Sequence, residues 1–174
     1  CPRSGTTLLE RMLDAHPGLE VLDERPAPEK SIARLRRLPG WRGGALDDAL
    51  GALSPSDLDE ARQAYWHEVR RYLVPRGRLV DKYPLYMTRV PYVARLFPRA
   101  AWLLMLRHPC DCVLSCHMQA FGFNGGALVF RSLESTAEAY ADMMEHWTSQ
   151  LAKVSMSAHV LRYEDLIADF HGEL

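Results

Sequence analysis

The sequence has no apolar segment long enough to span a membrane and no excess of one charge. A membrane-spanning helix needs about 18 or more apolar residues in succession, whereas the longest apolar run here extends from Ala100 to Leu106. The 21 Lys and Arg residues nearly balance the 22 Asp and Glu residues, and the net charge is −1. This balance provides no global attraction to nucleic acid or to an anionic membrane. Any basic binding surface is therefore expected to be local.

Cysteine is also scarce, with residues at positions 1, 110, 112 and 116. This spacing is not typical of a secreted disulfide framework in a chain of 174 residues. On a helix, Cys112 and Cys116 share a face while Cys110 points elsewhere, and no second Cys/His pair lies at zinc-ribbon spacing. The pattern favours buried thiols over a metal site that includes His117.

The rest of the composition, 48% hydrophobic and 25% charged, is that of an ordinary globular protein without internal repeats. A chain of 174 residues suits one domain with one core. It begins inside a loop motif, without a preceding strand, and it stops shortly after Phe170. We therefore expect residues 1–174 to form a single domain fragment that lacks its first strand and its C-terminal part.

Short apolar runs alternate along the chain with segments that have helical periodicity. Ser54 followed by Pro55 predicts the start of a long helix. Strands are expected at 19–22, 78–82, 100–106 and 159–163. Helices are expected at 55–73, 90–97 and 109–121, from a cap at Ser132 or Ser135 to about residue 154, and from the segment 164–168 onward. This alternation predicts an α/β fold with a central parallel sheet between two layers of helices. In such sheets, ligands bind at the carboxyl ends of the strands.

The segment 2–7 is a loop of small residues that leads directly into an amphipathic helix. Such a loop wraps backbone N–H groups around a phosphate at the positive end of the helix dipole. Its layout is that of a P-loop, but when aligned on Gly5 the lysine position holds Thr6 and the hydroxyl position holds Thr7. Without the lysine, the loop suits a nucleotide with one charged group at its 5′ end better than a triphosphate with Mg²⁺. The alternative is an ordinary helix cap after a turn.

The run Pro-Arg-Ser-Gly-Thr-Thr-Leu at 2–8, with Met-Leu-Asp-Ala-His-Pro at 12–17, resembles the 5′-phosphosulfate loop of the sulfotransferase family. It is most similar to the protein-tyrosine sulfotransferases and to bacterial sulfotransferase domains that often follow tetratricopeptide repeats. The resemblance implies a P-loop-like α/β/α fold. It also implies 3′-phosphoadenosine 5′-phosphosulfate (PAPS) as the sulfuryl donor, 3′-phosphoadenosine 5′-phosphate (PAP) as the product, and no metal. The implied cofactor-binding residues of the loop are Arg3, Ser4, Gly5, Thr6 and Thr7.

Arg107 lies at the exit of the strand expected at 100–106, and Ser115 follows eight residues later on the next helix. A phosphate between them would receive a forked contact from the guanidinium and a hydrogen bond from the hydroxyl. This spacing resembles the 3′-phosphate site of sulfotransferases. The alternative is that Arg107 pairs with Asp111 while Ser115 bonds to its own helix.

Glu24 follows the strand expected at 19–22 and is the candidate general base. Sulfuryl transfer, like phosphoryl transfer, requires an in-line acceptor, cations for the developing charge and a group that takes the acceptor proton. The resemblance implies this role for Glu24, because the tyrosine sulfotransferases carry their catalytic glutamate eight residues after the equivalent of His16. Asp23 is the competing candidate, and the alternative for Glu24 is a pair with Arg25 or a helix cap.

Lys82 ends the strand expected at 78–82, in a segment that resembles the family's Asn/Asp-Lys-x-Pro. The resemblance implies that Lys82 stabilises the transferring sulfonate and the leaving phosphate, and Arg3 supplies a second positive charge. Tyr163, within Arg-Tyr-Glu-Asp-Leu at 162–166, is implied to contact the adenine. The alternatives are a solvated lysine and a tyrosine packed in the core.

The predicted function is sulfuryl transfer from PAPS to a hydroxyl of a peptide tyrosine, a phenol or a carbohydrate. A P-loop kinase or NTPase, which would require a lysine in place of Thr6, and a degenerate nucleotide-binding domain without catalysis are the alternatives. Tetratricopeptide repeats are expected to precede this segment in the full-length protein. High Ala, Arg and Leu usage favours a bacterial, cytoplasmic protein, and the Golgi lumen is the alternative in a eukaryote.

Overall fold

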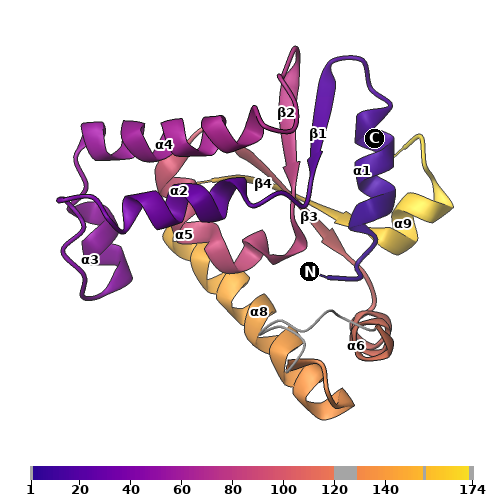
Figure 1. Cartoon of the computed structure of the whole chain (residues 1–174). Helices are drawn as coiled ribbons and strands as arrows, with labels where there is room; N and C mark the ends of the chain where they lie inside the picture. Colours follow the sequence, from indigo (N-terminus) through magenta and orange to yellow (C-terminus); the bar gives the residue numbers. More distant parts are fainter. Residues whose placement is uncertain (1, 120–128, 155, 173–174) are drawn as a thin grey trace. The chain divides into compact units, whose positions relative to one another are not determined.

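The computed structural model describes residues 2–119, 129–154 and 156–172 (Figure 1). The chain divides into two compact units. Unit 1 comprises Cys1–Leu9, Pro84–Thr88 and Ala101–Leu174, and unit 2 comprises Glu10–Tyr83 and Arg89–Ala100. The division falls within the first helix, α1 (Thr6–Asp14), and within the 3-10 helix η1 (Pro84–Arg89). The single domain expected from the chain length stays a prediction.

Unit 2 contains a parallel strand pair, β1 (Leu19–Asp23) and β2 (Arg78–Lys82), which lie side by side in Figure 1. Their register places Asp23 opposite Lys82 at the carboxyl ends. Just beyond, the backbone N–H of Glu24 donates to the Lys82 carbonyl at 2.8 Å. The pairing therefore brings three charged residues from two distant segments to one edge.

The helices of unit 2 are α2 (Ala27–Leu35), α3 (Leu46–Gly51), α4 (Pro55–Val69) and α5 (Val90–Leu96). The start of α4 is fixed locally, because Ser54 and Asp57 form a reciprocal capping box and Pro55 occupies the first turn. The main core cluster buries apolar side chains from all four helices and Leu53 from the segment between α3 and α4; the helical members are Ile32, Leu35, Leu50, Leu58, Ala61, Tyr92 and Leu96.

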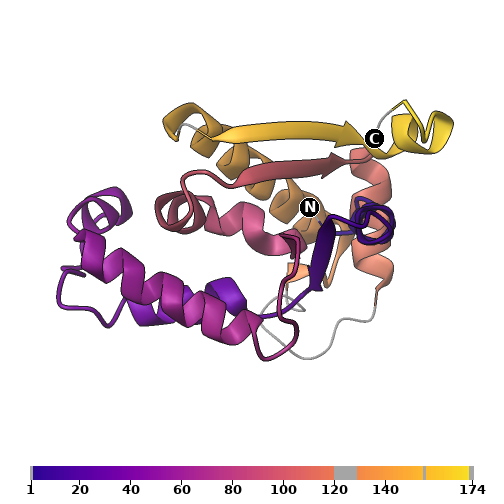
Figure 2. The same ribbon diagram turned by 90° about the horizontal axis from the view of Figure 1, so that it is seen from above.

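Unit 1 contains a second parallel pair, β3 (Ala101–Leu106) and β4 (Ser157–Arg162), seen side by side in Figure 2. Its helices are α6 (Pro109–Met118), α8 (Leu133–Lys153) and α9 (Tyr163–Ala168). Trp102 of β3 meets Trp147 of α8 edge to face, with ring centroids 5.7 Å apart. Because α9 begins directly after β4, Tyr163 lies at the carboxyl end of this strand pair.

The predicted α/β fold with parallel strands is confirmed, and each predicted strand lies within two residues of its expected bounds. Among the described residues the strands form two separate pairs, one in each unit. Helix α4 ends at Val69, four residues before its predicted end at residue 73. The backbone N–H groups of residues 71–73 instead donate to the carbonyls of Glu68 and Val69 and form a turn. The 3-10 helix η1 was not expected. The last residues of the predicted helix 109–121 lie outside the described part.

Candidate functional site

The loop before α1 combines a buried serine with two left-handed backbone positions. Ser4 is fully buried, and the φ angles of Arg3 and Gly5 are 62° and 97°. The Gly5 carbonyl accepts the first hydrogen bonds of α1, from the N–H groups of Leu8 and Leu9. The first turn of α1 carries no acidic residue, so its positive end is not neutralised from within the helix and suits an anion.

Arg3 and Arg107 line one open cavity of about 350 Å³ in unit 1. The Nε of Arg3 donates to the Ser115 hydroxyl at 2.9 Å, which joins the loop to the second turn of α6. Asp111 and Ser115 also line the cavity, as do the apolar side chains of Leu114 and Met118. Two guanidinium groups against one carboxylate leave this cavity positively charged, as an anion site requires.

Arg107 forms the pair with Asp111, and its role in binding a 3′-phosphate stays a prediction. Its Nη2 donates to the Asp111 carboxylate at 3.3 Å, the pairing given above as the alternative. Within the described part of the chain, however, its Nε is buried and has no hydrogen-bond partner. Because Asp111 is half-exposed, this long ion pair contributes little to stability. The guanidinium therefore keeps an unsatisfied donor for a further anion.

Tyr163 lies between the loop and Arg107. The Arg107 guanidinium carbon lies 4.8 Å from the centroid of the Tyr163 ring, a cation–π contact. On the loop side, a Cβ added to Gly5 would lie only 2.4 Å from Cδ2 of the same ring. The structure thus brings Gly5, Arg107 and Tyr163 together within unit 1. A contact of Tyr163 with adenine stays a prediction.

Glu164 connects the end of β4 to the turn that follows β3, and sequence reasoning gave it no role. Its Oε1 accepts a hydrogen bond from the His108 N–H at 2.8 Å, next to Arg107. This bond holds the pKa of Glu164 below its ordinary value, because it stabilises the charged carboxylate. The position of Glu164 beside Tyr163 in the family-like segment was the available signal.

The substitution Gly5→Ala tests the close approach of Tyr163 to the loop. An alanine at φ 97° costs about 1–2 kcal/mol in backbone strain, and its methyl group also collides with the ring. We expect Gly5→Ala to lower the free energy of unfolding in urea by more than the matched control Gly43→Ala. Gly43 has a φ of 72° but open space around it. In a Tyr163→Ala background, the excess of Gly5→Ala over Gly43→Ala should shrink, and an unchanged excess would contradict the contact.

Lys82, in unit 2, is surrounded by three carboxylates. Its Nζ lies 3.0 Å from Oε2 of Glu10, 2.5 Å from Oδ1 of Asp23 and 2.9 Å from Oε1 of Glu24. Burial by itself would lower the pKa of Lys82, but hydrogen bonds to Asp23 and Glu24 and the nearby Glu10 carboxylate raise it above its ordinary value. Lys82 is therefore charged at neutral pH, and the ammonium and its three partners carry a net charge of about −2.

Glu24 also has an unusual backbone conformation, with a φ of 46°. Among the described residues, Arg3 and Glu24 are the two non-glycine residues with positive φ. Such strain concentrates at functional sites, where the surrounding structure holds the residue in place. Both residues belong to the predicted catalytic set, and this coincidence supports that set without testing it.

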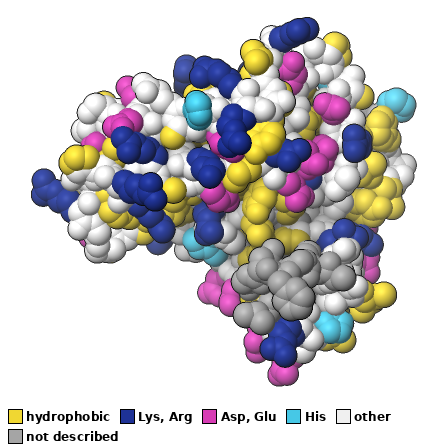
Figure 3. Space-filling model, in the orientation of Figure 1, with side chains coloured by type: hydrophobic (Ala, Val, Ile, Leu, Met, Phe, Trp, Pro, Cys, Tyr) yellow, Lys and Arg dark blue, Asp and Glu magenta, His cyan; other side chains and the backbone are white. Residues whose placement is uncertain are grey.

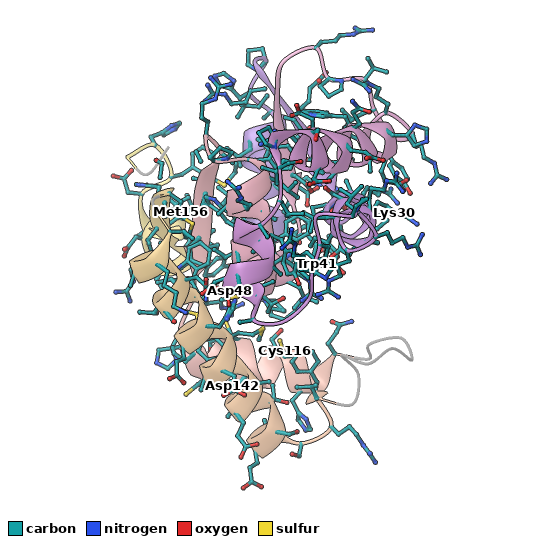
Figure 4. All side chains as sticks on the ribbon, turned by 90° about the vertical axis from the view of Figure 1, so that its left-hand side faces the viewer. Lys30, Trp41, Asp48, Cys116, Asp142 and Met156 are labelled. Carbon is teal, nitrogen blue, oxygen red and sulfur yellow. The ribbon has the colours of Figure 1, made fainter. Side chains whose placement is uncertain are left out.

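The cysteines do not combine into a metal centre in the described part of the chain, where no group of three or more His, Cys, Asp or Glu side chains is placed to bind an ion. Cys112 and Cys116 of α6 are buried, and burial raises the pKa of both thiols. Figure 4 labels Cys116 on α6 and Asp142 on α8, two helices in contact. Cys110 is exposed, unlike its two neighbours, and Cys1 lies outside the described residues.

Comparison with known proteins gives one family for the whole chain. The sequence model of the Sulfotransferase family matches residues 1–174. Protein-tyrosine sulfotransferase 1 of Mus musculus is 38% identical over 112 residues, which cover 61% of this chain and 29% of the mouse protein. The Homo sapiens protein of the same name is 36% identical over 112 residues, with the same coverage. The matched segment thus spans less than a third of the length of these relatives.

Two further matches come from bacteria. An uncharacterized protein of Aquifex aeolicus is 28% identical over 153 residues, which cover 84% of this chain and 20% of that protein. The crystal structure of a sulfotransferase from Alicyclobacillus acidocaldarius superposes with a TM-score of 0.48 and 16% sequence identity, over 96% of this chain and 72% of that chain. In the described residues, no helix has both the length and the apolar character needed to cross a membrane.

Proposed function

Because this chain belongs to the sulfotransferase family, we propose that it transfers the sulfuryl group of PAPS to an acceptor hydroxyl. The donor and the acceptor are the parts of this proposal that go beyond family membership. The observation that supports it best is that the Tyr163 ring contacts both Gly5 and Arg107, the two positions that we assign to anion binding.

The loop and the cavity of unit 1 bind different parts of PAPS. Backbone groups of residues 3–7 at the start of α1 bind the 5′-phosphosulfate, and Arg107 and Ser115 bind the 3′-phosphate. Arg3 adds its charge to the same cavity. In the described structure, the Ser115 hydroxyl accepts a hydrogen bond from Arg3, and its own proton can still be donated to a phosphate oxygen.

The proposed reaction is a displacement at sulfur. The acceptor oxygen attacks the sulfur as the bond from sulfur to the bridging phosphate oxygen breaks, and PAP leaves. Glu24 takes the acceptor proton, and Lys82 neutralises the charge that develops on the bridging oxygen. No step in this sequence requires a redox partner, and the proton and the electron pairs balance between the acceptor, Glu24 and PAP.

Tyrosine in a protein or peptide is the proposed acceptor, because the relatives from Mus musculus and Homo sapiens are protein-tyrosine sulfotransferases. A tyrosine hydroxyl has a pKa of about 10 and is mostly protonated at neutral pH, so its attack benefits from a base. A phenol or a carbohydrate hydroxyl is the alternative acceptor. A cytoplasmic location and tetratricopeptide repeats stay predictions.

The exposed basic side chains of unit 2 give weaker information about the acceptor. Figure 3 shows Lys and Arg side chains on the surface of this part of the chain. Five exposed basic residues lie on α2 and the segment after it, namely Lys30, Arg34, Arg36, Arg37 and Arg42. Figure 4 labels Lys30 on α2 and Trp41 after it. Two of these charges already have partners, because Arg34 pairs with Glu60 and Arg36 bonds to the Tyr92 hydroxyl. A solvated helix face accounts for the rest.

Calorimetry with PAP, followed by a radiolabelled PAPS assay, tests the proposal. We expect PAP to bind without Mg²⁺, and label to transfer to tyrosine peptides in a screen that also contains phenols and sugars. Binding of Mg²⁺-ATP without binding of PAP would instead favour the P-loop kinase or NTPase. Binding of PAP without transfer to any acceptor class would favour a non-catalytic nucleotide-binding domain.

A further inference from the structure

Glu10 has no role in the mechanism so far, yet it is one of the few buried charged residues of the described chain. It lies in the middle of α1, and its side chain is 7% exposed. A buried carboxylate is unfavourable unless it is paired. Its partner is Lys82, at 3.0 Å. The sequence separates the two residues by 72 positions, so their contact exists only in the folded chain.

We propose that Glu10 is a positioning residue that keeps hold of the Lys82 ammonium when Glu24 releases it to take part in catalysis. This inference rests on the function proposed above for Lys82 and Glu24. Of the three carboxylates around Lys82, Glu10 is then the permanent partner, and Asp23 and Glu24 are exchangeable partners.

The crowding of carboxylates around Lys82 creates the need for an exchange. Three carboxylate oxygens lie within 3.0 Å of Nζ; Glu24 accepts a hydrogen bond from Nζ, whereas Oε2 of Glu10 is held by the ion pair alone, without a hydrogen bond. An oxygen of the donor substrate can reach the ammonium only after one of the three carboxylates moves away. When Glu24 leaves, one N–H of Lys82 becomes available, and a carboxylate oxygen of Glu24 becomes available for the acceptor proton. A single movement thus prepares both groups.

Burial decides which carboxylates can leave. The side chains of Asp23 and Glu24 are 56% and 51% exposed, so water replaces the ammonium when either pair opens, at little cost. Glu10 is enclosed, and opening its pair would leave an uncompensated buried charge, which is strongly unfavourable. Glu10 therefore stays with Lys82 while the exposed partners exchange.

The position of Glu10 on a regular helix fixes the location of its carboxylate relative to Lys82 more precisely. Both α1 and β2 are held by backbone hydrogen bonds, and side chains on such elements are placed more accurately than those on loops. Without the Glu10 carboxylate, Lys82 would keep two of its three carboxylate partners, the exposed Asp23 and Glu24. The ammonium would then shift toward the exposed pair and hold Glu24 away from the acceptor.

Glu10→Gln is the informative variant, because it keeps the size of the side chain and removes its charge. We expect kcat to fall about 10- to 100-fold, the scale on which a small misplacement of a catalytic group acts, with the KM for PAPS nearly unchanged. Glu10→Asp, which keeps the charge on a shorter stem, should lose less activity. Asp14→Asn is the matched control, since Asp14 lies one turn further along α1 and is exposed.

A second readout follows the Lys82 ammonium directly, by nuclear magnetic resonance of ¹⁵N-labelled lysine side chains. A held, shielded ammonium exchanges its protons slowly and gives a resolved signal, which is assigned to Lys82 by its loss in Lys82→Arg. We expect the signal to persist in the wild type, in Asp14→Asn and in Asp23→Asn, and to disappear in Glu10→Gln. Circular dichroism of each variant checks that it is folded.

Three outcomes would overturn the inference. Glu10→Gln with an unchanged Lys82 signal would show that Glu10 does not hold the ammonium, whatever the activity. Loss of the signal in Asp23→Asn as well would show that burial does not separate the partners. An unchanged kcat in Glu10→Gln would show that the hold has no part in catalysis. If the wild type transfers no sulfuryl group, the proposed function fails, and the Lys82 signal still decides whether Glu10 anchors the lysine.

Discussion

Replacement of Glu24 by alanine is expected to reduce turnover by about 10²-fold or more, the lower end of what a general base contributes. PAP binding should be retained, because the loop, Arg107 and Ser115 that we assign to PAP all belong to unit 1, while Glu24 belongs to unit 2. Turnover is measured with radiolabelled PAPS, and the affinity for PAP by calorimetry. A variant that bound PAP much more weakly would contradict this assignment.

Glu24→Gln separates the charge of the carboxylate from the size of the side chain. Glutamine, unlike alanine, keeps the length of the side chain, and it cannot accept a proton at neutral pH. A loss of turnover as large as that of Glu24→Ala assigns the effect to the carboxylate. If both variants keep full turnover, Glu24 has no part in the mechanism, and Asp23→Asn then tests the neighbouring carboxylate.

The second large effect is expected from Arg107→Ala in the discrimination between nucleotides. Hydrogen bonds to a charged group contribute about 1.5–3 kcal/mol, which corresponds to about a 10- to 100-fold change in affinity. We expect this loss for PAP and little change for adenosine 5′-phosphate, which has no 3′-phosphate. Calorimetry with both nucleotides measures the difference.

Two further variants sharpen the Arg107 experiment. Arg107→Lys keeps the charge without the fork, so it should recover only part of the affinity for PAP. Arg162→Ala removes an exposed arginine of unit 1 that pairs with Asp165 at 3.8 Å and should leave both affinities unchanged. Equal weakening of both nucleotides by Arg107→Ala would defeat the 3′-phosphate assignment and favour a structural role beside Asp111.

Local sequence signals predicted the elements of this fold. The apolar run at 100–106 gave β3, and Ser54 with Pro55 gave the start of α4, where the capping box is found. Both signals act within a few residues, so tertiary packing does not need to be known. The end of α4 was less predictable, because Tyr72 and Leu73 are apolar and fit the helical pattern, although they lie in the turn that follows Val69.

The candidate site was predicted in part. The loop, Arg107, Lys82 and Glu24 were named from their motifs, and the structure groups Arg107 with the loop and Lys82 with Glu24. Glu10 and Glu164 were missed, because their partners lie 72 and 56 residues away. A carboxylate on an ordinary helix carries no local sign of the lysine that it will meet.

The sequence alone thus determined which segments become strands and helices and which residue types stand at the strand ends, because apolar periodicity and capping are short-range properties. The tertiary structure decided which of those residues meet. The parallel register of β1 and β2 sets Asp23 opposite Lys82, and the packing of Tyr163 joins Gly5 to Arg107. Such contacts depend on strand pairing and on side-chain burial between segments that are distant in the sequence. The exposure of a side chain and the charges around it are set by the folded chain and cannot be read from one short segment.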